Sequence, residues 1–394
     1  MTLEYPTRRC WAEIDLGALL HNLDIARAQL APGVKIMAVV KANAYGHGIA
    51  GIGRALAGQV EMFGVASFAE ALELRTHVSD APIFILGAAL PEERELIVAH
   101  RFVPAVSSVV EARAFAALAS PSPLAVHLVI DTGMGRMGIP ERDAAKIVRE
   151  IAAIEGLAIT GLASHLPVAD EDDSFTRDQL TRFHQIVGQL RACGLTQPAV
   201  HIENSAGIIA YPTQAGDMVR TGLMLYGSAP FQKFQARLRA VMTWKARITL
   251  VRDVPPGHGI SYGRTFITQA PMRIATVGVG YADGYQRHLS NRGAEVLVCG
   301  RRCAVLGRVT MDQILVDITA LPEAREGDEV VLMGRQGSEE IFAAELARKA
   351  GTIPWEIFTG IGRRVDRVCV DAPAAMQRAS DSGVAMRCEG PYLR

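Results

Sequence analysis

Residues that could carry out acid–base and anion-binding chemistry recur at the ends of short apolar runs in this sequence. Lys41 closes the run IMAVV. A lysine in this position is partly desolvated, which lowers its pKa and favours the neutral amine that can form a Schiff base with an aldehyde. Other polar residues at or just beyond such ends are Asn43, Tyr45, Asp131, Arg136, Ser164, His165, His201, Asn204, Ser205 and Arg220.

Several of these residues together could hold a phosphorylated aldehyde. Ser205 and the backbone of Gly222 and Leu223 would supply neutral donors for a phosphate, and Arg220 offers a fixed cation to a ring atom or a carboxylate. Pyridoxal phosphate needs a lysine for its aldehyde, donors for its phosphate and a side chain at its ring nitrogen. Each of these residues could be structural when taken alone, so the hypothesis depends on their convergence.

The elements that would bring these residues together are short β-rich runs that alternate with helical patterns. The expected strands are 36–41, 63–67, 83–87, 102–107, 125–132, 159–165, 199–204 and 218–222, and the expected helices include 16–30, 69–78, 109–119, 141–154 and 177–193. An open doubly wound sheet would also alternate, but eight strands favour an α/β fold with a (β/α)8 barrel. Active sites of such barrels lie at the carboxyl ends of the strands.

The pattern changes after about residue 235, where strand-like runs follow one another without long helices. The expected strands are 243–254, 272–280, 295–298, 303–309, 313–318 and 328–333, followed by a helix over 342–350. This pattern predicts a mainly antiparallel β domain. We expect a cofactor-binding barrel over 10–235, a β domain over 236–372 that residues 1–15 join, and a tail over 373–394.

Composition excludes several classes of protein. Lys plus Arg and Asp plus Glu each number 41, so net charge gives no argument for nucleic acid or an anionic membrane as the main partner. No apolar stretch reaches the about 20 residues of a membrane-spanning helix, and no secretory signal is visible, so we expect a cytoplasmic protein. Cys299 and Cys303 have no further ligand nearby, and no metal site is expected.

At this point the sequence resembles the alanine racemases, which are fold-type III pyridoxal-phosphate enzymes. The resemblance runs from about Cys10 to Val370, and its motifs occur in the family's order. These motifs are AVVKANAYGHG (38–48), DTGMGRMG (131–138), ASHLPVADE (163–171), HIENSAG (201–207), VRTGLMLYG (219–227), ISYGRTF (260–266), GYADGY (280–285), GRVTMDQ (307–313) and TIPWEIFTG (352–360).

The resemblance implies a role for each matched residue. Lys41 would hold the cofactor and act as one catalytic base, and Tyr262 of the partner subunit would act as the other. The phosphate would be bound by Tyr45, Ser205, Gly222 and Leu223 beside Asn204, and the pyridine nitrogen would face Arg220 with His165 behind it. The substrate carboxylate would bind Arg136 and the backbone of Met311, and Tyr281 would guard the entrance.

The implied activity is interconversion of L-alanine and D-alanine. Two opposed bases can remove a proton from one face of the α-carbon and return one to the other; Lys41 would act on D-alanine and Tyr262 on L-alanine. The family's shared active site implies a homodimer, and its usual role implies supply of D-alanine for peptidoglycan. An arginine at the pyridine nitrogen cannot readily accept a proton, so the carbanion should be short-lived.

Two positions depart from the family's pattern. Val129 stands where the family often has a carbamylated lysine that steadies the substrate-binding arginine, and Trp355 stands where a tyrosine usually touches the phosphate. Indole has one N–H donor and no acceptor. Both changes lie by the substrate, so we expect relaxed or altered specificity, for example toward serine, with a serine racemase of this fold as the alternative.

Rival hypotheses come from other classes of protein. Gly133-Met-Gly135-Arg-Met-Gly138 matches the dinucleotide pattern GxGxxG, but it does not lie in a first βαβ unit. Gly259-Ile-Ser261-Tyr-Gly263 matches the hydrolase pattern GxSxG, but a β-rich segment follows it. A third rival is a non-catalytic pyridoxal-phosphate carrier, which would lack the β domain and its Tyr262.

Overall fold

The structure is a computed structural model that describes residues 8–119, 121–212 and 216–371. Within these ranges the chain forms two compact units. The barrel unit comprises 20–44 and 52–239, and the β unit comprises 8–19, 45–51 and 240–371. The expected tail, 373–394, and the first seven residues of the segment 1–15 lie outside the described residues.

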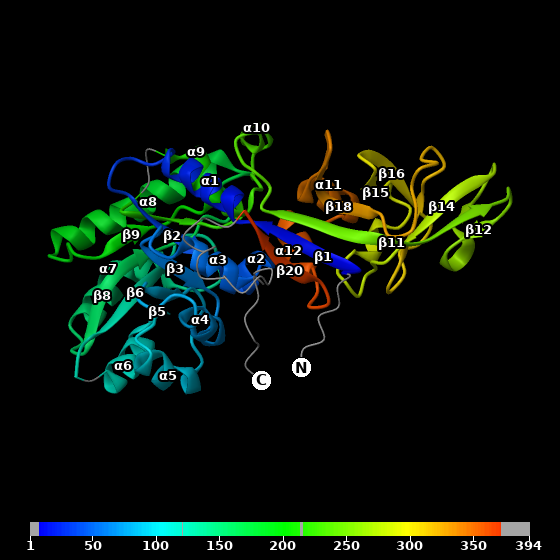
Figure 1. Cartoon of the computed structure of the whole chain (residues 1–394). Helices are drawn as coiled ribbons and strands as arrows, with labels where there is room; N and C mark the ends of the chain where they lie inside the picture. The colour runs from blue at the N-terminus through cyan, green and yellow to red at the C-terminus, as the bar shows by residue number, and fades with distance from the viewer. Residues whose placement is uncertain (1–7, 120, 213–215, 372–394) are drawn as a thin grey trace, which may run out of the picture. The chain divides into compact units, whose positions relative to one another are not determined.

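The barrel unit contains a sheet of eight parallel strands in the order β10-β2-β3-β4-β5-β6-β8-β9. Backbone bonds from Asp217 N to Val200 O (2.8 Å) and from Arg220 N to Glu203 O (2.9 Å) connect the two ends of this order and nearly close the barrel. The predicted (β/α)8 barrel is therefore confirmed (Figure 1). The strands are β2 (Lys35–Val39), β3 (Met62–Val65), β4 (Ile83–Ile85), β5 (Val103–Val106), β6 (Leu124–Asp131), β8 (Leu157–Ala163), β9 (Ala199–His201) and β10 (Met218–Thr221), with a short β7 (Ile139–Pro140) beside β6.

Helices connect the strands of the barrel. They are α1 (Leu16–Arg27), α2 (Lys41–Tyr45), α3 (Ile49–Leu56), α4 (Phe68–Arg75), α5 (Arg94–Ala99), α6 (Val109–Leu118), α7 (Ala144–Ala152), α8 (Asp173–Ala192), α9 (Ser205–Ala210) and α10 (Gln232–Gln235). Two of them begin with the same signal, a serine followed three residues later by a glutamate. Ser67 caps α4 and Ser108 caps α6, and each hydroxyl accepts the backbone N–H of the glutamate.

The barrel interior combines an apolar cluster with buried histidines. The cluster consists of Met37, Met62, Phe84, Val103, Ala105 and Met218, with Leu86, Ala125, Val129 and Met137 packed against it. His127 and His201 lie in the same interior with at most 1% of their surface exposed, and their rings pack near Phe84. The apolar cluster leaves the histidines little access to water, so their hydrogen bonds must come from protein groups.

The β unit is built on a nine-stranded sheet in the order β19-β18-β15-β16-β17-β14-β11-β1-β20. The pairs are antiparallel except for β1 and β20, so the predicted mainly antiparallel domain is confirmed. In Figure 1 the long strand β11 runs beside β1. The strands are β1 (Cys10–Asp15), β11 (Met242–Val254), β14 (Met272–Val277), β15 (Glu295–Val298), β16 (Arg301–Leu306), β17 (Ile314–Asp317), β18 (Glu329–Gln336), β19 (Glu339–Ile341) and β20 (Asp366–Val370).

Smaller elements complete the β unit. The helices α11 (Ala343–Ala350) and α12 (Pro354–Gly360) lie near its end, and β12 (Gly259–Ile260) pairs with β13 (Phe266–Ile267) in a separate hairpin. The sequence had predicted the first helix but not the second, nor the two strands of the hairpin. The hairpin matters for function because its connection carries Tyr262.

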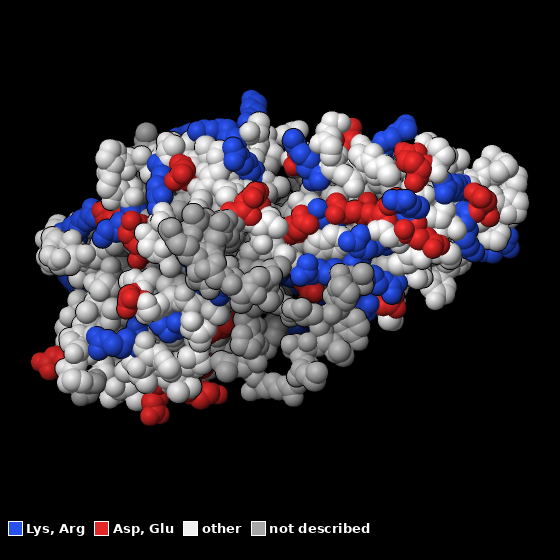
Figure 2. All heavy atoms as spheres, viewed as in Figure 1, with Lys and Arg blue, Asp and Glu red and all other residues white. Residues whose placement is uncertain are grey.

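The surface carries charges of both signs. On the face shown in Figure 2, basic and acidic side chains are interspersed. None of the helices in the described part of the chain has both the length and the apolar character that crossing a membrane would require.

Candidate active site

The predicted site residues fall into two groups, one in each unit. The barrel unit holds Lys41, Arg136, His165, Asn204, Ser205, Arg220, Gly222 and Leu223. The β unit holds Tyr45, Tyr262, Tyr281, Met311 and Trp355. The barrel group lies at or beyond the carboxyl ends of the strands, where side chains from different strands converge.

The sequence had predicted that Lys41 ends a strand, and this prediction is wrong because β2 ends at Val39. Lys41 opens α2, two residues beyond the end of β2, and the chain then enters a left-handed turn in which Ala42, Asn43 and Ala44 have φ values of 53–54°. The pKa of Lys41 is lowered by burial, then by Arg136, and also by Arg220, while Glu70 raises it. The neutral amine is the nucleophilic form, so this environment suits bonding to an aldehyde.

Arg220 lies in β10 with 5% of its surface exposed and is held by several acceptors. Its Nη1 donates to the carbonyl of His201 (2.9 Å) and to Nδ1 of the same residue (2.6 Å). Its Nη2 donates to the carbonyls of Ser164 (2.6 Å) and Ile202 (3.0 Å) and to Nδ1 of His165 (3.1 Å). This fork of bonds fixes the orientation of the guanidinium group.

The histidines around Arg220 are neutral at ordinary pH. Burial, and next Arg220, lower the pKa of His165 to about 3 and that of His201 well below its usual value. Burial also lowers the pKa of Arg220 to about 10, so its guanidinium keeps its charge near neutrality. At the barrel rim the charged Arg220 is therefore surrounded by neutral hydrogen-bond acceptors, which include His165 and His201.

The segment that begins α9 offers anion-binding groups. Ser205 Oγ accepts the N–H groups of Gly222 (3.1 Å) and Met224 (3.3 Å), which leaves the hydroxyl hydrogen as a donor. Asn204 caps the helix, since its Oδ1 accepts the N–H groups of Ala206 and Gly207. Leu223 opens a short 3-10 turn and is 2% exposed. Asn204 thus orders this segment, and Ser205 presents its hydroxyl.

The loop that carries Arg136 is organised by Asp131. The carboxylate of Asp131 accepts the backbone N–H groups of Gly133 (3.0 Å), Met134 (2.9 Å) and Gly135 (3.1 Å). A dinucleotide site would need such N–H groups for its pyrophosphate. Because a carboxylate already occupies them, the GxGxxG pattern here is an internally closed turn, and it leaves Arg136 exposed.

Val129 packs against the apolar cluster of the barrel together with Met137. A valine carries no charge and no hydrogen-bonding side-chain group. The position that departs from the family's pattern therefore contributes packing rather than an anion near Arg136.

In the β unit, Tyr262 is 71% exposed between β12 and β13. The preceding Ser261 has a φ of 61°, and its hydroxyl donates to the carbonyl of Arg308 at 2.6 Å. A hydrolase nucleophile would stand on a strand-turn-helix elbow with its hydroxyl free to react. Ser261 instead lies in a hairpin connection and anchors it, which argues against the hydrolase hypothesis.

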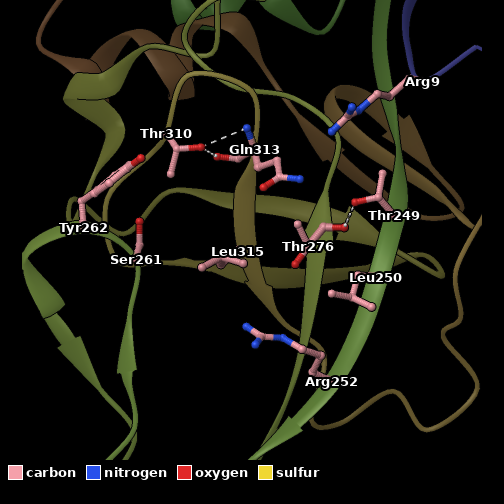
Figure 3. A pocket seen from close by; sticks show the side chains of 10 residues that line it. All are labelled: Arg9, Thr249, Leu250, Arg252, Ser261, Tyr262, Thr276, Thr310, Gln313 and Leu315. Atoms are coloured by element: carbon pink, nitrogen blue, oxygen red, sulfur yellow. Dashed lines mark hydrogen bonds between the residues drawn. The ribbon is translucent and has the colours of Figure 1, made fainter.

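Tyr262 borders a hollow of about 820 Å³ on the β unit. Figure 3 shows the side chains that line it, which come from β11, β14, β17 and the loop before β17, from the hairpin connection and from the residue before β1. The lining residues are Arg9, Thr249, Leu250, Arg252, Ser261, Tyr262, Thr276, Thr310, Gln313 and Leu315. The hollow is thus lined by two cations, several hydroxyl groups and the exposed tyrosine.

Tyr281 and Met311 lie close together in this unit. Tyr281 N donates to the carbonyl of Thr310 and Ala282 N to that of Met311, both at 3.0 Å. A side chain at Gly280 would meet the Met311 carbonyl at 2.3 Å, so only glycine permits this approach. Tyr281 and Met311 are 41% and 52% exposed, which leaves both accessible on the surface of the unit.

Tyr45 and Trp355 are the remaining predicted residues. Tyr45 is 8% exposed, and burial raises the pKa of its phenol to about 12, so it is a neutral hydroxyl. Trp355 lies in the first turn of α12 and is half-buried. Both belong to the β unit.

The sequence analysis missed three polar residues of the barrel rim and interior. His127 Nδ1 lies 3.0 Å from Nε2 of His201. Glu203 is fully buried, and its carbonyl accepts the N–H of Arg220. Glu70 accepts the N–H of Ala42, the residue after Lys41. A polar residue inside an apolar strand was the available signal for His127, but Glu70 resembles an ordinary helix-capping glutamate.

Metal chemistry gains no support from the described ranges, which contain no group of three or more His, Cys, Asp or Glu side chains that could hold a metal ion. The donor set at the barrel rim suits an organic anion with an aldehyde instead. It combines an amine with a lowered pKa, a buried guanidinium and a serine hydroxyl at a helix start.

Comparisons with known proteins cover both units. Residues 14–230 match the family model for the N-terminal domain of alanine racemase, and residues 241–369 match that for its C-terminal domain. The chain is 43% identical over 367 residues to an alanine racemase of Halothermothrix orenii, covering 92% of this chain and 97% of the relative. It is 44% identical over 359 residues to that of Syntrophobacter fumaroxidans, covering 90% and 95%.

Solved structures give the same result. The structure of alanine racemase from Clostridium difficile 630 superposes with a TM-score of 0.86 at 35% sequence identity. The match covers 92% of this chain and 96% of that one. The similarity therefore extends over the fold as well as the sequence.

Proposed function

The chain belongs to the alanine racemase family and is an amino-acid racemase, and we propose that it interconverts L-alanine and D-alanine by a two-base reaction with pyridoxal 5'-phosphate. The observation that carries the proposal is the barrel rim, where Lys41 has a lowered pKa under the influence of burial, Arg136 and Arg220. An amine and two cations in one place suit a substrate and a cofactor that are both anionic.

The residues of the barrel rim fit pyridoxal phosphate. Lys41 would bond its aldehyde, Arg220 would face its ring nitrogen with His165 behind, and the Ser205 hydroxyl with Gly222 and Leu223 would bind its phosphate. Tyr45 and Trp355 are the proposed phosphate contacts from the β unit, and Asn204 holds the start of α9. When bound, the cofactor withdraws electrons from the substrate's α-carbon and so makes the α-proton removable.

The chain's own residues then move the protons. From D-alanine, the neutral amine of Lys41 would take the α-proton while the Tyr262 hydroxyl of the partner subunit gives one to the opposite face. From L-alanine, the Tyr262 phenolate of the partner subunit would take the proton while the protonated Lys41 gives one. Because the two bases act on opposite faces, neither has to move across the substrate. Arg220 is a cation that only donates hydrogen bonds, so it would donate to the cofactor's ring nitrogen and would not take part in the proton transfer.

The substrate carboxylate is bound by Arg136 and the backbone N–H of Met311, and Tyr281 limits access. The exposure of Arg136, Tyr281 and Met311 supports these roles, because each can reach a small molecule from solvent. Val129 supplies no anion to restrain Arg136, so another side chain or a bound anion takes that part, or this arginine moves more freely.

The proposed active form is a homodimer that shares its active sites. Tyr262 is 71% exposed and borders a large hollow on the β unit. A catalytic tyrosine needs to be shielded from water to act as a base, and a second subunit would supply that shielding.

The proposed physiological role is supply of D-alanine for peptidoglycan in the cytoplasm. A second candidate function, racemisation of serine, is favoured by Val129 and Trp355, which depart from the family's pattern at positions near the substrate. A non-catalytic carrier of the cofactor is disfavoured because the chain matches the C-terminal racemase domain as well.

The experiment that tests the proposal is chiral chromatography of L-alanine and of L-serine after incubation with the purified protein. The proposal expects D-alanine to form until both enantiomers are equal. Formation of D-serine with a kcat/KM within about 10³-fold of that for alanine, roughly 4 kcal/mol of discrimination, would support relaxed specificity. Cofactor binding without any racemised product would contradict the proposed reaction.

A further inference from the structure

Glu70, in the first turn of α4, accepts hydrogen bonds from the backbone at two neighbouring strand ends. Its Oε1 accepts the N–H of Ala42 at 2.7 Å, and its Oε2 accepts the N–H of Ala66 at 2.8 Å. Ala66 follows β3, and Ala42 is the residue directly after Lys41. One carboxylate therefore ties the start of the lysine-bearing turn to the next strand of the barrel.

A second glutamate in the same barrel shows which of these bonds belongs to helix capping. Ser67 and Glu70 open α4 as Ser108 and Glu111 open α6, and each glutamate donates its N–H to its serine. Glu111 Oε2 accepts the N–H of Ser107, just as Glu70 Oε2 accepts that of Ala66. The bond from Glu70 to Ala42 is additional to this shared capping pattern.

The backbone that Glu70 holds is strained. Ala42, Asn43 and Ala44 have φ values of 53–54° and Tyr45 has 52°. Non-glycine residues are energetically disfavoured in this left-handed region, because Cβ comes close to the following carbonyl oxygen. A run of such residues persists only if surrounding groups hold it, and the charged acceptor at Ala42 N is one of them.

Glu70 also differs in charge from the other groups that act on Lys41. Arg136 and Arg220 lower the pKa of Lys41, as does burial, whereas Glu70 raises it. His165 is also close enough to interact electrostatically with Lys41, but its own low pKa keeps it neutral. The effect of Glu70 on the pKa of Lys41 is thus opposite to that of the two arginines.

We propose that Glu70 is a positioning residue for Lys41, which holds the left-handed turn through Ala42 N and sets one negative charge against the positive charges of the two arginines. This inference rests on the proposed function, because it assigns significance to the amine that would hold the cofactor. It concerns a carboxylate that touches neither substrate nor cofactor and acts only through the lysine.

The test is the pH dependence of cofactor uptake. Apo-protein, made from the full-length holoenzyme by dialysis against hydroxylamine, is mixed with pyridoxal phosphate, and the rate of binding is followed by absorbance. Only the neutral amine attacks the aldehyde, so the rate rises with pH up to the pKa of Lys41. In Glu70→Gln the midpoint should move to lower pH by about 0.5–1 unit, since one partly solvated opposite charge is lost.

Two further variants distinguish the effect of the Glu70 charge from the effect of helix capping. Glu111→Gln removes the matched capping carboxylate from α6, so it should lower thermal stability but leave the midpoint at the wild-type value. Glu70→Asp keeps the charge, so its midpoint should return toward the wild-type value. An unshifted midpoint in Glu70→Gln, or an equal shift in Glu111→Gln, overturns the proposal. A wild-type protein that takes up no cofactor at any pH overturns the proposed function as well.

A measurement on the wild-type protein covers the case in which Glu70→Gln does not fold. Hydrogen exchange should show the Ala42 and Ala66 amides protected together, because one carboxylate accepts both N–H groups. An Ala42 amide that exchanges as fast as an unstructured peptide contradicts the proposed tether.

Discussion

Nη1 of Arg220 lies 2.6 Å from Nδ1 of His201. A guanidinium group only donates hydrogen bonds, so Nδ1 of His201 must be the acceptor and its hydrogen must be on Nε2. That Nε2 lies 3.0 Å from Nδ1 of His127, which must therefore accept in turn. One cation thus fixes the tautomers of two successive buried histidines, and the histidines in return restrain the cation.

The first prediction concerns the end of this chain of hydrogen bonds. His127→Leu should lower the free energy of unfolding by about 1–3 kcal/mol, because it leaves the Nε2–H of His201 buried without an acceptor. His127→Asn offers an acceptor oxygen near the position of Nδ1. Its free energy of unfolding should therefore fall clearly less than that of His127→Leu. Urea unfolding of the two variants measures the difference. Equal losses would show that His127 contributes packing alone.

A second prediction follows from Glu203, which is fully buried beside the Arg220 backbone. Burial raises the pKa of its carboxyl from 4.5 to about 7, against the smaller opposing effects of backbone N–H donors, first its own and that of Ile202, and then of Arg220. Because folding raises this pKa, the folded state prefers the protonated carboxyl. Its contribution to stability is full below pH 4.5 and is lost as the pH rises through about 7.

Glu203→Gln should therefore gain stability relative to the wild type as the pH rises from 5 to 8, by roughly 2.5 kcal/mol for a shift of this size. Urea unfolding at a series of pH values measures the difference between the two proteins. A difference that stays constant over this range would mean that Glu203 does not titrate with a raised pKa.

The fold and the site were predictable from the sequence to different degrees. The eight barrel strands are contiguous apolar runs that local patterning reveals, and parallel strand ends meet at one rim, so the rim residues could be predicted as a group. The strands β1 and β20 were missed because they pair with each other across almost the whole chain. A histidine inside an apolar strand was a local signal for His127, but its hydrogen bond to His201, 74 residues away, could not be predicted.

The geometry around Lys41 could not be predicted for a different reason. In a sequence, glycine is the usual sign of a left-handed turn. The residues of this turn, Ala42, Asn43 and Ala44, include no glycine. Glu70 sits in a Ser-x-x-Glu signal that indicates only a helix start. Its contact with Ala42 depends on the neighbouring strand, which no local pattern encodes.

A third prediction tests the proposed second base. Tyr262→Phe should reduce racemisation about 10²–10⁴-fold, the usual contribution of a general acid or base, while the cofactor stays bound. Because Tyr262 is 71% exposed, the thermal midpoint of unfolding should hardly change. D-alanine should still exchange its α-hydrogen in deuterium oxide, since Lys41 acts on that enantiomer.

The control for this variant is Tyr211→Phe, which removes a hydroxyl that donates to Asp173 at 2.9 Å and has no proposed role in the reaction. It should racemise alanine at the wild-type rate. Full racemase activity in Tyr262→Phe would contradict the two-base reaction, whatever the control shows.

A fourth prediction concerns the proposed dimer. If Tyr262 serves the partner subunit, specific activity should fall when the enzyme is diluted below the dissociation constant of the dimer, and it should return on concentration. Sedimentation velocity at the same concentrations should show monomers where activity is lost. A monomer that keeps full activity would rule out a shared site.

The most direct test of the central claim is to fix the cofactor in place and find the residue that carries it. The purified protein, treated with borohydride in the presence of pyridoxal phosphate, is digested and its peptides are analysed by mass spectrometry. The account predicts one modified peptide, with the phosphopyridoxyl group on Lys41, and none in Lys41→Ala. A modification on another lysine, or no stable modification, would contradict the assignment of Lys41 and with it the proposed reaction.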